Sequence, residues 1–109
     1  MTIPNHPFET FDWTTVPKET HNGETGFAYW QVLHVGNIRV RMVEYSPGYM
    51  ADHWCSKGHI IYCITGSMQT TLQDGRIFTL VNGMTYHVGD SNEAHKTSSD
   101  EGCRLFIVD

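Results

Sequence analysis

The stretch Gly48-Tyr-Met-Ala-Asp-His53-Trp-Cys55-Ser-Lys-Gly-His59-Ile-Ile-Tyr-Cys63-Ile-Thr-Gly66 combines strand-like patterning with reactive side chains. Residues two apart on a strand share a face, so His53 and Cys55 should point the same way. By the same rule, His59 and Cys63 share a face of the next predicted strand. If the two strands pair, His53, Cys55 and His59 lie together on the face of a pocket.

The side chains gathered on this face are metal ligands by type. Imidazole nitrogen and thiolate sulfur both bind Zn²⁺, Fe²⁺, Ni²⁺ or copper well. Hard cations such as Ca²⁺ and Mg²⁺ prefer oxygen ligands instead. We therefore expect a divalent transition metal, either zinc, iron or nickel, in this pocket.

Outside this stretch, short apolar segments alternate with turn signals. Gly36-Asn37, Asp74-Gly75 and Asn82-Gly83 are two-residue sequences typical of hairpin turns. The predicted strands lie at residues 27–35, 38–42, 60–64, 67–73, 76–81, 85–88, 95–98 and 104–108. Residues 38–42 alternate apolar and cationic side chains, which predicts one buried face and one face in water. Many short strands separated by closely spaced turns indicate a sandwich or a barrel.

The composition agrees with a sheet protein. Only three residues are alanine, whereas Thr, Val, Ile and aromatic residues are common. No stretch shows convincing helical periodicity. A chain of 109 residues would not divide into two stable parts, so we expect one all-β domain.

Charge and cysteine content exclude several classes of protein. The formal net charge is −5, which argues against long-lived binding to nucleic acid. No apolar run approaches the ~20 residues that cross a bilayer, and the N-terminal residues lack the pattern of a signal peptide. Cys55, Cys63 and Cys103 are an odd number without a Cys-x-x-Cys pair, so they predict no disulfide framework. We therefore expect a cytoplasmic protein without nucleic-acid or membrane partners.

Two segments are predicted, an extended N-terminal arm over residues 1–25 and a barrel domain over residues 26–109. The arm holds three of the four prolines. Phe8, Phe11 and Trp13 give it apolar side chains that would pack either on its own barrel or on a second subunit.

The spacing His53-x-Cys55-x3-His59-x6-Gly66 resembles the first signature of the cupins, a family of small jelly-roll β-barrels. The family usually has two histidines and a glutamate where this chain has His53, Cys55 and His59. Residues 83–95 resemble the second signature, with one extra residue, no proline and His95 at its end. The Asp-His-Trp-Cys sequence also resembles an uncharacterised cupin subgroup known by an Asp-His-Cys-Trp motif.

The resemblance implies a jelly-roll barrel, or double-stranded β-helix, over roughly residues 26–108, with four metal ligands. These ligands would be His53, Cys55, His59 and His95. Three nitrogens and one thiolate form a softer set than the family's usual three histidines and one glutamate, and resemble zinc or low-valent metal sites. A closed set of four would be structural, and one missing ligand would leave a catalytic opening.

Several assignments stay open from the sequence. His87 competes with His95 as the last ligand, although strand alternation favours His95 because it turns His87 outward. Asp52 either orients a ligand histidine through its other ring nitrogen or is an exposed loop acid. Cys63 either lines the core or pairs with Cys55 across neighbouring strands.

Three functions follow from these residues. The first is a metal-dependent enzyme, an oxygenase or isomerase, acting on a small polar molecule in a pocket walled by Met42, Ile61 and Cys63. The second is a non-enzymatic module that binds a small ligand or a metal, with a structural metal or none. The third is redox sensing by Cys55 and Cys63. We also expect a homodimer, because the resemblance implies pairing through sheet faces.

Overall fold

Strands make up nearly all of the regular structure. The computed structural model describes residues 2–109, so Met1, the first residue of the predicted arm, lies outside it. The described residues form one short 3-10 helix, η1 (Trp13–Thr15), and nine strands. The strands are β1 (Glu19–Asn22), β2 (Phe27–Val35), β3 (Ile38–Tyr45), β4 (Tyr49–Met50), β5 (His59–Leu72), β6 (Ile77–Val81), β7 (Thr85–Val88), β8 (His95–Ser99) and β9 (Cys103–Val108). The all-β prediction is confirmed.

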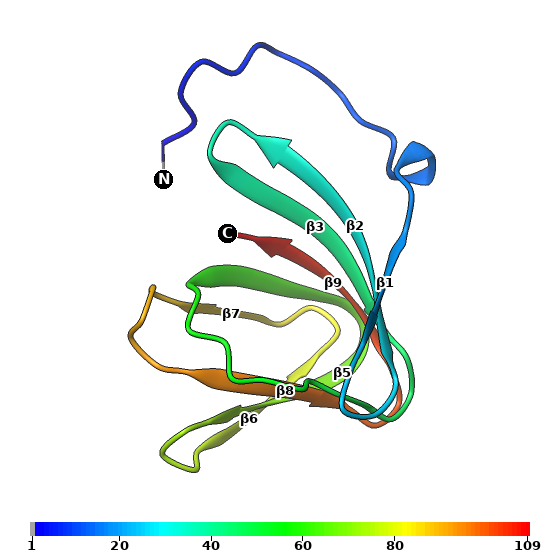
Figure 1. The fold of residues 1–109 in the computed structure, drawn as a ribbon, viewed down its shortest axis with the longest axis vertical. Helices are drawn as coiled ribbons and strands as arrows, with labels where there is room; N and C mark the ends of the chain where they lie inside the picture. Colours follow the sequence, from blue (N-terminus) through cyan, green and yellow to red (C-terminus); the bar gives the residue numbers. More distant parts are fainter. Residues whose placement is uncertain (1) are drawn as a thin grey trace.

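The strands form one curled antiparallel sheet. Its order is β1-β2-β3-β9-β5-β8-β4, and β6 and β7 also pair with β5. Figure 1 shows one limb made of β1, β2, β3 and β9 and a second limb that contains β6 and β8, with β5 running between them. This curled arrangement confirms the predicted jelly-roll barrel. Within residues 2–109, no helix has the length and apolar character needed to span a bilayer.

Strand β5 belongs to both limbs. Its first part pairs with β7 and β9, and its last part pairs with β6 and β8. Between these parts the register with β9 shifts at Cys63 and Thr65, and Gly66 adopts a φ of 83°. Glycine enters this left-handed region without steric cost, so the strand can bend there. Two strands were predicted at 60–64 and 67–73, and the structure joins them into one bent strand.

The core lies between the limbs, where alternate side chains of the strands meet. Its fully buried members are Val43, Ile61, Cys63, Met68, Leu80, Cys103, Leu105 and Ile107. Two of the predicted pocket walls, Ile61 and Cys63, are therefore on the inner face. Met42 is half-buried on the opposite face of β3 from Arg41 and Val43.

The cationic side chains of β3 point inward. Arg41 is only 6% exposed, and Arg39 is also partly buried beside it. Alternation predicted one buried face and one face in water for this strand, without saying which is which. The structure buries the cationic face, where a buried acid, Asp109, neutralises part of the arginine charge inside the barrel.

The N-terminal arm contacts its own barrel. The side-chain amide of Gln31 donates hydrogen bonds to the carbonyl oxygens of Trp13 and Val16 at 2.7 and 2.8 Å. Figure 1 shows the arm passing beside the β2–β3 hairpin. The last part of the predicted arm forms strand β1, which pairs with β2. This strand is polar, so its sequence carries no alternation from which it could be predicted.

Candidate metal centre

Three of the four predicted ligands come together at the inner end of the barrel. The ligand atoms of Cys55, His59 and His95 all lie within 4.8 Å of one another. His59 begins β5 and His95 begins β8, while Cys55 lies in the loop after β4. Two backbone hydrogen bonds between Cys55 and His95, at 2.8 and 2.9 Å, fix the loop against β8.

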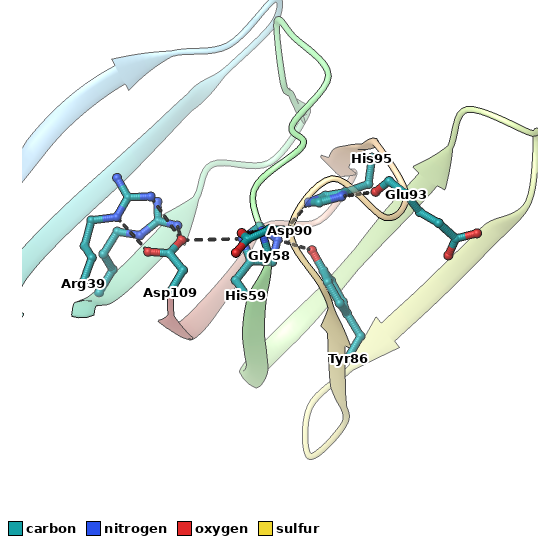
Figure 2. Close-up of polar contacts among 9 residues, drawn as sticks. Arg39, Gly58, His59, Tyr86, Asp90, Glu93, His95 and Asp109 are labelled. Carbon is teal, nitrogen blue, oxygen red and sulfur yellow. Dashed lines mark hydrogen bonds and ion pairs between the residues drawn. The ribbon is translucent and has the colours of Figure 1, made fainter. Parts of the chain in front are cut away.

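Both histidines present Nε2 to the centre. The two Nε2 atoms are 2.8 Å apart. On the far side of each ring, Nδ1 of His95 lies 2.9 Å from the Glu93 carbonyl oxygen, and Nδ1 of His59 lies 3.6 Å from Oδ2 of Asp109 (Figure 2). The Glu93 carbonyl thus orients the His95 ring in the way that is common for metal-binding histidines, whereas Nδ1 of His59 is buried without a hydrogen-bond partner among the described residues.

The environment of His59 keeps its ring neutral. Burial and the neighbouring His95 lower the pKa of His59 to about 4, although the charge of Asp109 opposes the shift. A metal binds the neutral imidazole, so no proton has to be removed from this ring at neutral pH. The Gly58 amide donates to Oδ1 of Asp90 at 2.7 Å, which ties the start of β5 to the loop after β7.

Tyr86 completes the inner surface of this centre. Its hydroxyl lies 3.2 Å from Nε2 of His59, and burial raises the pKa of this phenol well above its usual range. Tyr86 therefore stays protonated and can hydrogen-bond to a group bound beside His59.

His53 is not part of this cluster. Residues 52–54 form no strand, so the alternation that predicted a shared face for His53 and Cys55 does not operate there. The His53 side chain is 74% exposed, and its Nδ1 lies 2.7 Å from Oδ1 of Asp52. The ligand role of His53 stays a prediction. His87 is exposed on β7 and is also outside the cluster.

The donor set fits a divalent transition metal. One thiol sulfur and two imidazole nitrogens are ligands that Zn²⁺ and related ions accept, and three protein ligands leave a fourth tetrahedral position open. The three donors line a cavity of about 270 Å³ together with residues that include Tyr45, His53 and Ile107. The cluster could therefore hold a metal that a small molecule can reach.

An ion-pair group beside His59, in the wall of the same cavity, was not predicted from the sequence. Arg39 binds the Asp109 carboxylate through Nε at 2.9 Å and Nη2 at 3.1 Å, and Arg41 binds it through Nη2 at 3.0 Å. Burial alone would raise the pKa of Asp109, but the hydrogen bonds from Arg39 and the charges of both arginines lower it. Two arginines at alternate positions of one strand were a visible signal, but the alternation did not say which face is buried, and their pairing with Asp109 depends on contact between β3 and β9.

The three cysteines are free thiols. Cys63 and Cys103 are buried in the core, and burial raises the pKa of both. A raised pKa leaves less thiolate, so neither is suited to rapid oxidation. The cysteine placed beside other ligands is Cys55.

Comparisons with known proteins identify the fold. No protein-family model and no curated protein sequence matches the chain. Among solved structures, it resembles a sugar phosphate isomerase of a cupin superfamily from Silicibacter pomeroyi, with a TM-score of 0.71 and 13% identity over 92% of this chain and 74% of that chain.

Two further structures agree. A cupin-2 domain protein from Shewanella frigidimarina has a TM-score of 0.61 and 18% identity over 73% of this chain and 78% of that one. A variant of oxalate decarboxylase from Bacillus subtilis has a TM-score of 0.66 and 19% identity over 96% of this chain, which spans only 31% of that protein. The chain therefore has the cupin fold.

Proposed function

We propose that this protein is a metal-dependent enzyme that acts on a small polar molecule. The observation that carries the proposal is the convergence of Cys55, His59 and His95, with ligand atoms within 4.8 Å, beside a cavity of about 270 Å³. These three residues would hold the metal. Three protein ligands with one position left for water or substrate are typical of a catalytic zinc site, whereas four protein ligands are typical of a structural one.

The donor set favours zinc, with iron and nickel as the other candidates. A thiolate and two imidazoles form a soft set that suits zinc and carries one negative charge. A metal bound there would polarise an oxygen of the substrate as a Lewis acid. Around it, Tyr86 would hydrogen-bond to the bound molecule, and the Glu93 carbonyl would keep the His95 ring in position.

The names of two structural neighbours are consistent with chemistry on small polar molecules. One is a sugar phosphate isomerase and the other an oxalate decarboxylase. Neither reaction is assigned to this chain, because a shared fold does not determine the reaction. Isomerisation and oxygenation of a small molecule are the reaction classes that we would test first.

Metal analysis of the purified protein tests the proposal. We expect about one transition-metal ion per chain, and a cobalt-substituted protein with the absorption of a thiolate-to-cobalt charge transfer. Cys55→Ser and His95→Ala should each weaken metal binding by about a hundredfold or more, since loss of a group behind the ligands already costs about 10–100-fold. Cys63→Ser is the matched thiol control and should keep the metal. If neither the purified nor the reconstituted protein contains a stoichiometric amount of metal, the proposal is overturned.

A closed structural site is the second candidate, because His53 lines the same cavity and lies two residues from Cys55. If His53 supplied a fourth ligand, the metal would have no open position. His53→Ala would then change the cobalt spectrum and weaken binding as much as His95→Ala does. The enzymatic proposal instead requires that His53→Ala retains the metal and that small anions perturb the cobalt spectrum.

A further inference from the structure

The cavity beside the metal centre has an excess of positive charge on its inner wall. Counting side chains, Arg39 and Arg41 contribute two positive charges and Asp109 contributes one negative charge. One cationic charge of this group is therefore unmatched by any side chain in contact with it.

The other basic side chains at the cavity have partners of their own. Lys96 lies 3.4 Å from a carboxylate oxygen of Glu24, and Nδ1 of His53 lies 2.7 Å from Oδ1 of Asp52. Among the described residues that line the cavity, Asp109 is the one with a carboxylate side chain. This side chain is 0% exposed and pairs with both arginines. An anion entering the cavity would thus meet no free negative side chain on this wall.

Arg41 has a donor that is not used. Its side chain is nearly completely buried, and its Nε has no hydrogen-bond partner among the described residues. A buried donor without a partner is costly, and more so on a charged group. The cost is removed if a ligand supplies an acceptor to the guanidinium group.

The guanidinium of Arg41 is held in place by Trp30. Its carbon lies 4.5 Å from the centre of the Trp30 ring, and the ring of His21 stacks on Trp30 at 3.9 Å. This cation–π contact fixes the plane of the guanidinium group while its edge remains able to donate. Trp30 also lines the cavity, so it provides an apolar surface next to the charge.

We propose that the cavity binds a small organic carboxylate, with Arg41 and Trp30 recognising the anion and the Cys55, His59 and His95 centre facing its other end. The planar fork of a guanidinium group matches a carboxylate. A cavity of about 270 Å³ lies below the ~300–1,000 Å³ typical of pockets for drug-sized ligands, which restricts the ligand to a small molecule. The inference deepens the proposed function and rests on it for the role of this anion as a substrate.

A pair of isosteric probes tests the recognition without any mutation. The metal-free and the zinc-loaded protein would be titrated with benzoate, benzamide and inorganic phosphate at constant ionic strength. The readouts would be the NMR signals of the Arg41 Nε–H and Trp30 indole N–H groups. We expect benzoate to shift both signals and to bind about tenfold or more tightly than benzamide, as a charge-assisted hydrogen bond requires.

Two variants locate the site. Arg41→Gln removes the unused donor but leaves Arg39 paired with Asp109, and it should weaken benzoate binding by about tenfold to a hundredfold. Arg104→Gln is the matched control, because it removes the same charge from the exposed face of β9 and should leave binding unchanged. If Arg41→Gln does not fold, the comparison of benzoate with benzamide on the unmutated protein still decides the question.

The outcomes separate this inference from the proposed function. Equal binding of benzoate and benzamide, no shift at Arg41 and Trp30, or tighter binding of phosphate than of benzoate would overturn the carboxylate site. Benzoate binding by a protein that never takes up a metal would support the anion site and refute the metalloenzyme. Metal uptake with no benzoate binding would support the metalloenzyme and refute the anion site.

Discussion

Asp109 contacts three of the side chains that line the cavity. Its carboxylate binds Arg39 and Arg41 and lies 3.6 Å from Nδ1 of His59. Replacing it by asparagine would leave two arginines partly buried without a countercharge. Breaking a buried ion pair in this way costs about 3 kcal/mol, so we expect Asp109→Asn to lower the free energy of unfolding by about that amount in urea titrations.

The exposed acid Asp74 offers the matched control. Asp74 pairs with Arg76 on the surface, where more than half of both side chains is exposed. Asp74→Asn should change the free energy of unfolding by less than about 1 kcal/mol, since exposed ion pairs contribute little. Similar effects of the two substitutions would show that the Asp109 group is not a buried ion-pair network.

His59 makes the stability of the metal-free protein depend on pH. Its pKa is about 4 in the folded chain against 6.5 for an ordinary histidine. Between these values the unfolded chain binds a proton that the folded chain does not. The contribution of His59 to the free energy of unfolding is therefore fully present above pH 6.5 and is lost as the pH drops toward 4. We expect a loss of about 1 kcal/mol per pH unit in that window, measured by chemical denaturation in the presence of a chelator.

Variants at two histidines check the origin of this slope. His59→Gln should flatten it, whereas His34→Gln, at an exposed position on β2, should leave it unchanged. The lowered pKa of Asp109 acts in a separate window, because its contribution is lost only as the pH falls through and below about 3.8. A slope that survives in His59→Gln would contradict the assignment.

The sequence could predict the residues of the metal centre where these residues lie on regular strands, because strand periodicity then fixes the direction of their side chains. His59 and His95 begin strands, and the sequence named both, with Cys55, as ligands. His53 was placed beside Cys55 by the same periodicity, but the backbone there follows bends. The roles of Arg41 and Asp109 could not be predicted, because they depend on β3 and β9 meeting across a long separation in sequence.

Among the elements, β5 depends most on one residue. Gly66 has a φ of 83°, and a Cβ atom added there would collide with the carbonyl oxygen of Gly102 and lie 2.8 Å from the Cα of Cys103. We therefore expect Gly66→Ala to lower the free energy of unfolding by the strain of the left-handed backbone, about 1–3 kcal/mol, and by a further cost of displacing β9. Thermal and urea unfolding would measure the sum.

A substitution at Gly83 separates the backbone strain from the cost of displacing β9. Its φ of 90° is similar, but a Cβ atom added there meets nothing within 4 Å. Gly83→Ala should therefore show the backbone strain alone and be less destabilising than Gly66→Ala. Equal losses would mean that the close approach of Gly66 to Gly102 contributes nothing to stability.

The prediction of elements succeeded where a segment alternated and ended at a turn. The turns at Asp74-Gly75 and Asn82-Gly83 were correctly placed, the first as the hairpin between β5 and β6, and the adjoining strands agree within a few residues. Strands β1 and β4 were missed, because a polar strand of four residues and a strand of two carry too little pattern. For β3 the period was correct, but alternation does not say which side is buried, so the inward arginines were not predicted.

At the scale of the whole molecule, the outer face of the sheet exposes apolar side chains on β5. Ile60 and Tyr62 of β5 are 47% and 44% exposed on the face opposite the core. We expect a homodimer through this face, with a mass by light scattering of twice 12.4 kDa. The double variant Ile60→Lys, Tyr62→Lys should shift the mass to that of one chain by placing like charges in the interface.

An apolar pair elsewhere provides the control for the dimer. Ile77 and Phe78 of β6 are 60% and 49% exposed, and their double lysine variant should leave the mass unchanged. A single-chain mass for the unmutated protein at micromolar concentration would contradict the dimer. Arm exchange would be seen separately, as loss of the dimer when Phe8, Phe11 and Trp13 are replaced by serine.

The ion pair between Arg39 and Asp109 joins residues that are 70 positions apart in the sequence, and this separation affects how the protein folds. Contacts of such long separation pay the entropy of closing a large loop, and proteins dominated by them fold in roughly milliseconds to seconds. Before β3 and β9 have paired, Arg39 and Arg41 do not contact Asp109, and Asp109 does not lie beside His59. A metal or an anion can therefore bind only the finished fold, and by mass action either one would draw the last step of folding toward completion.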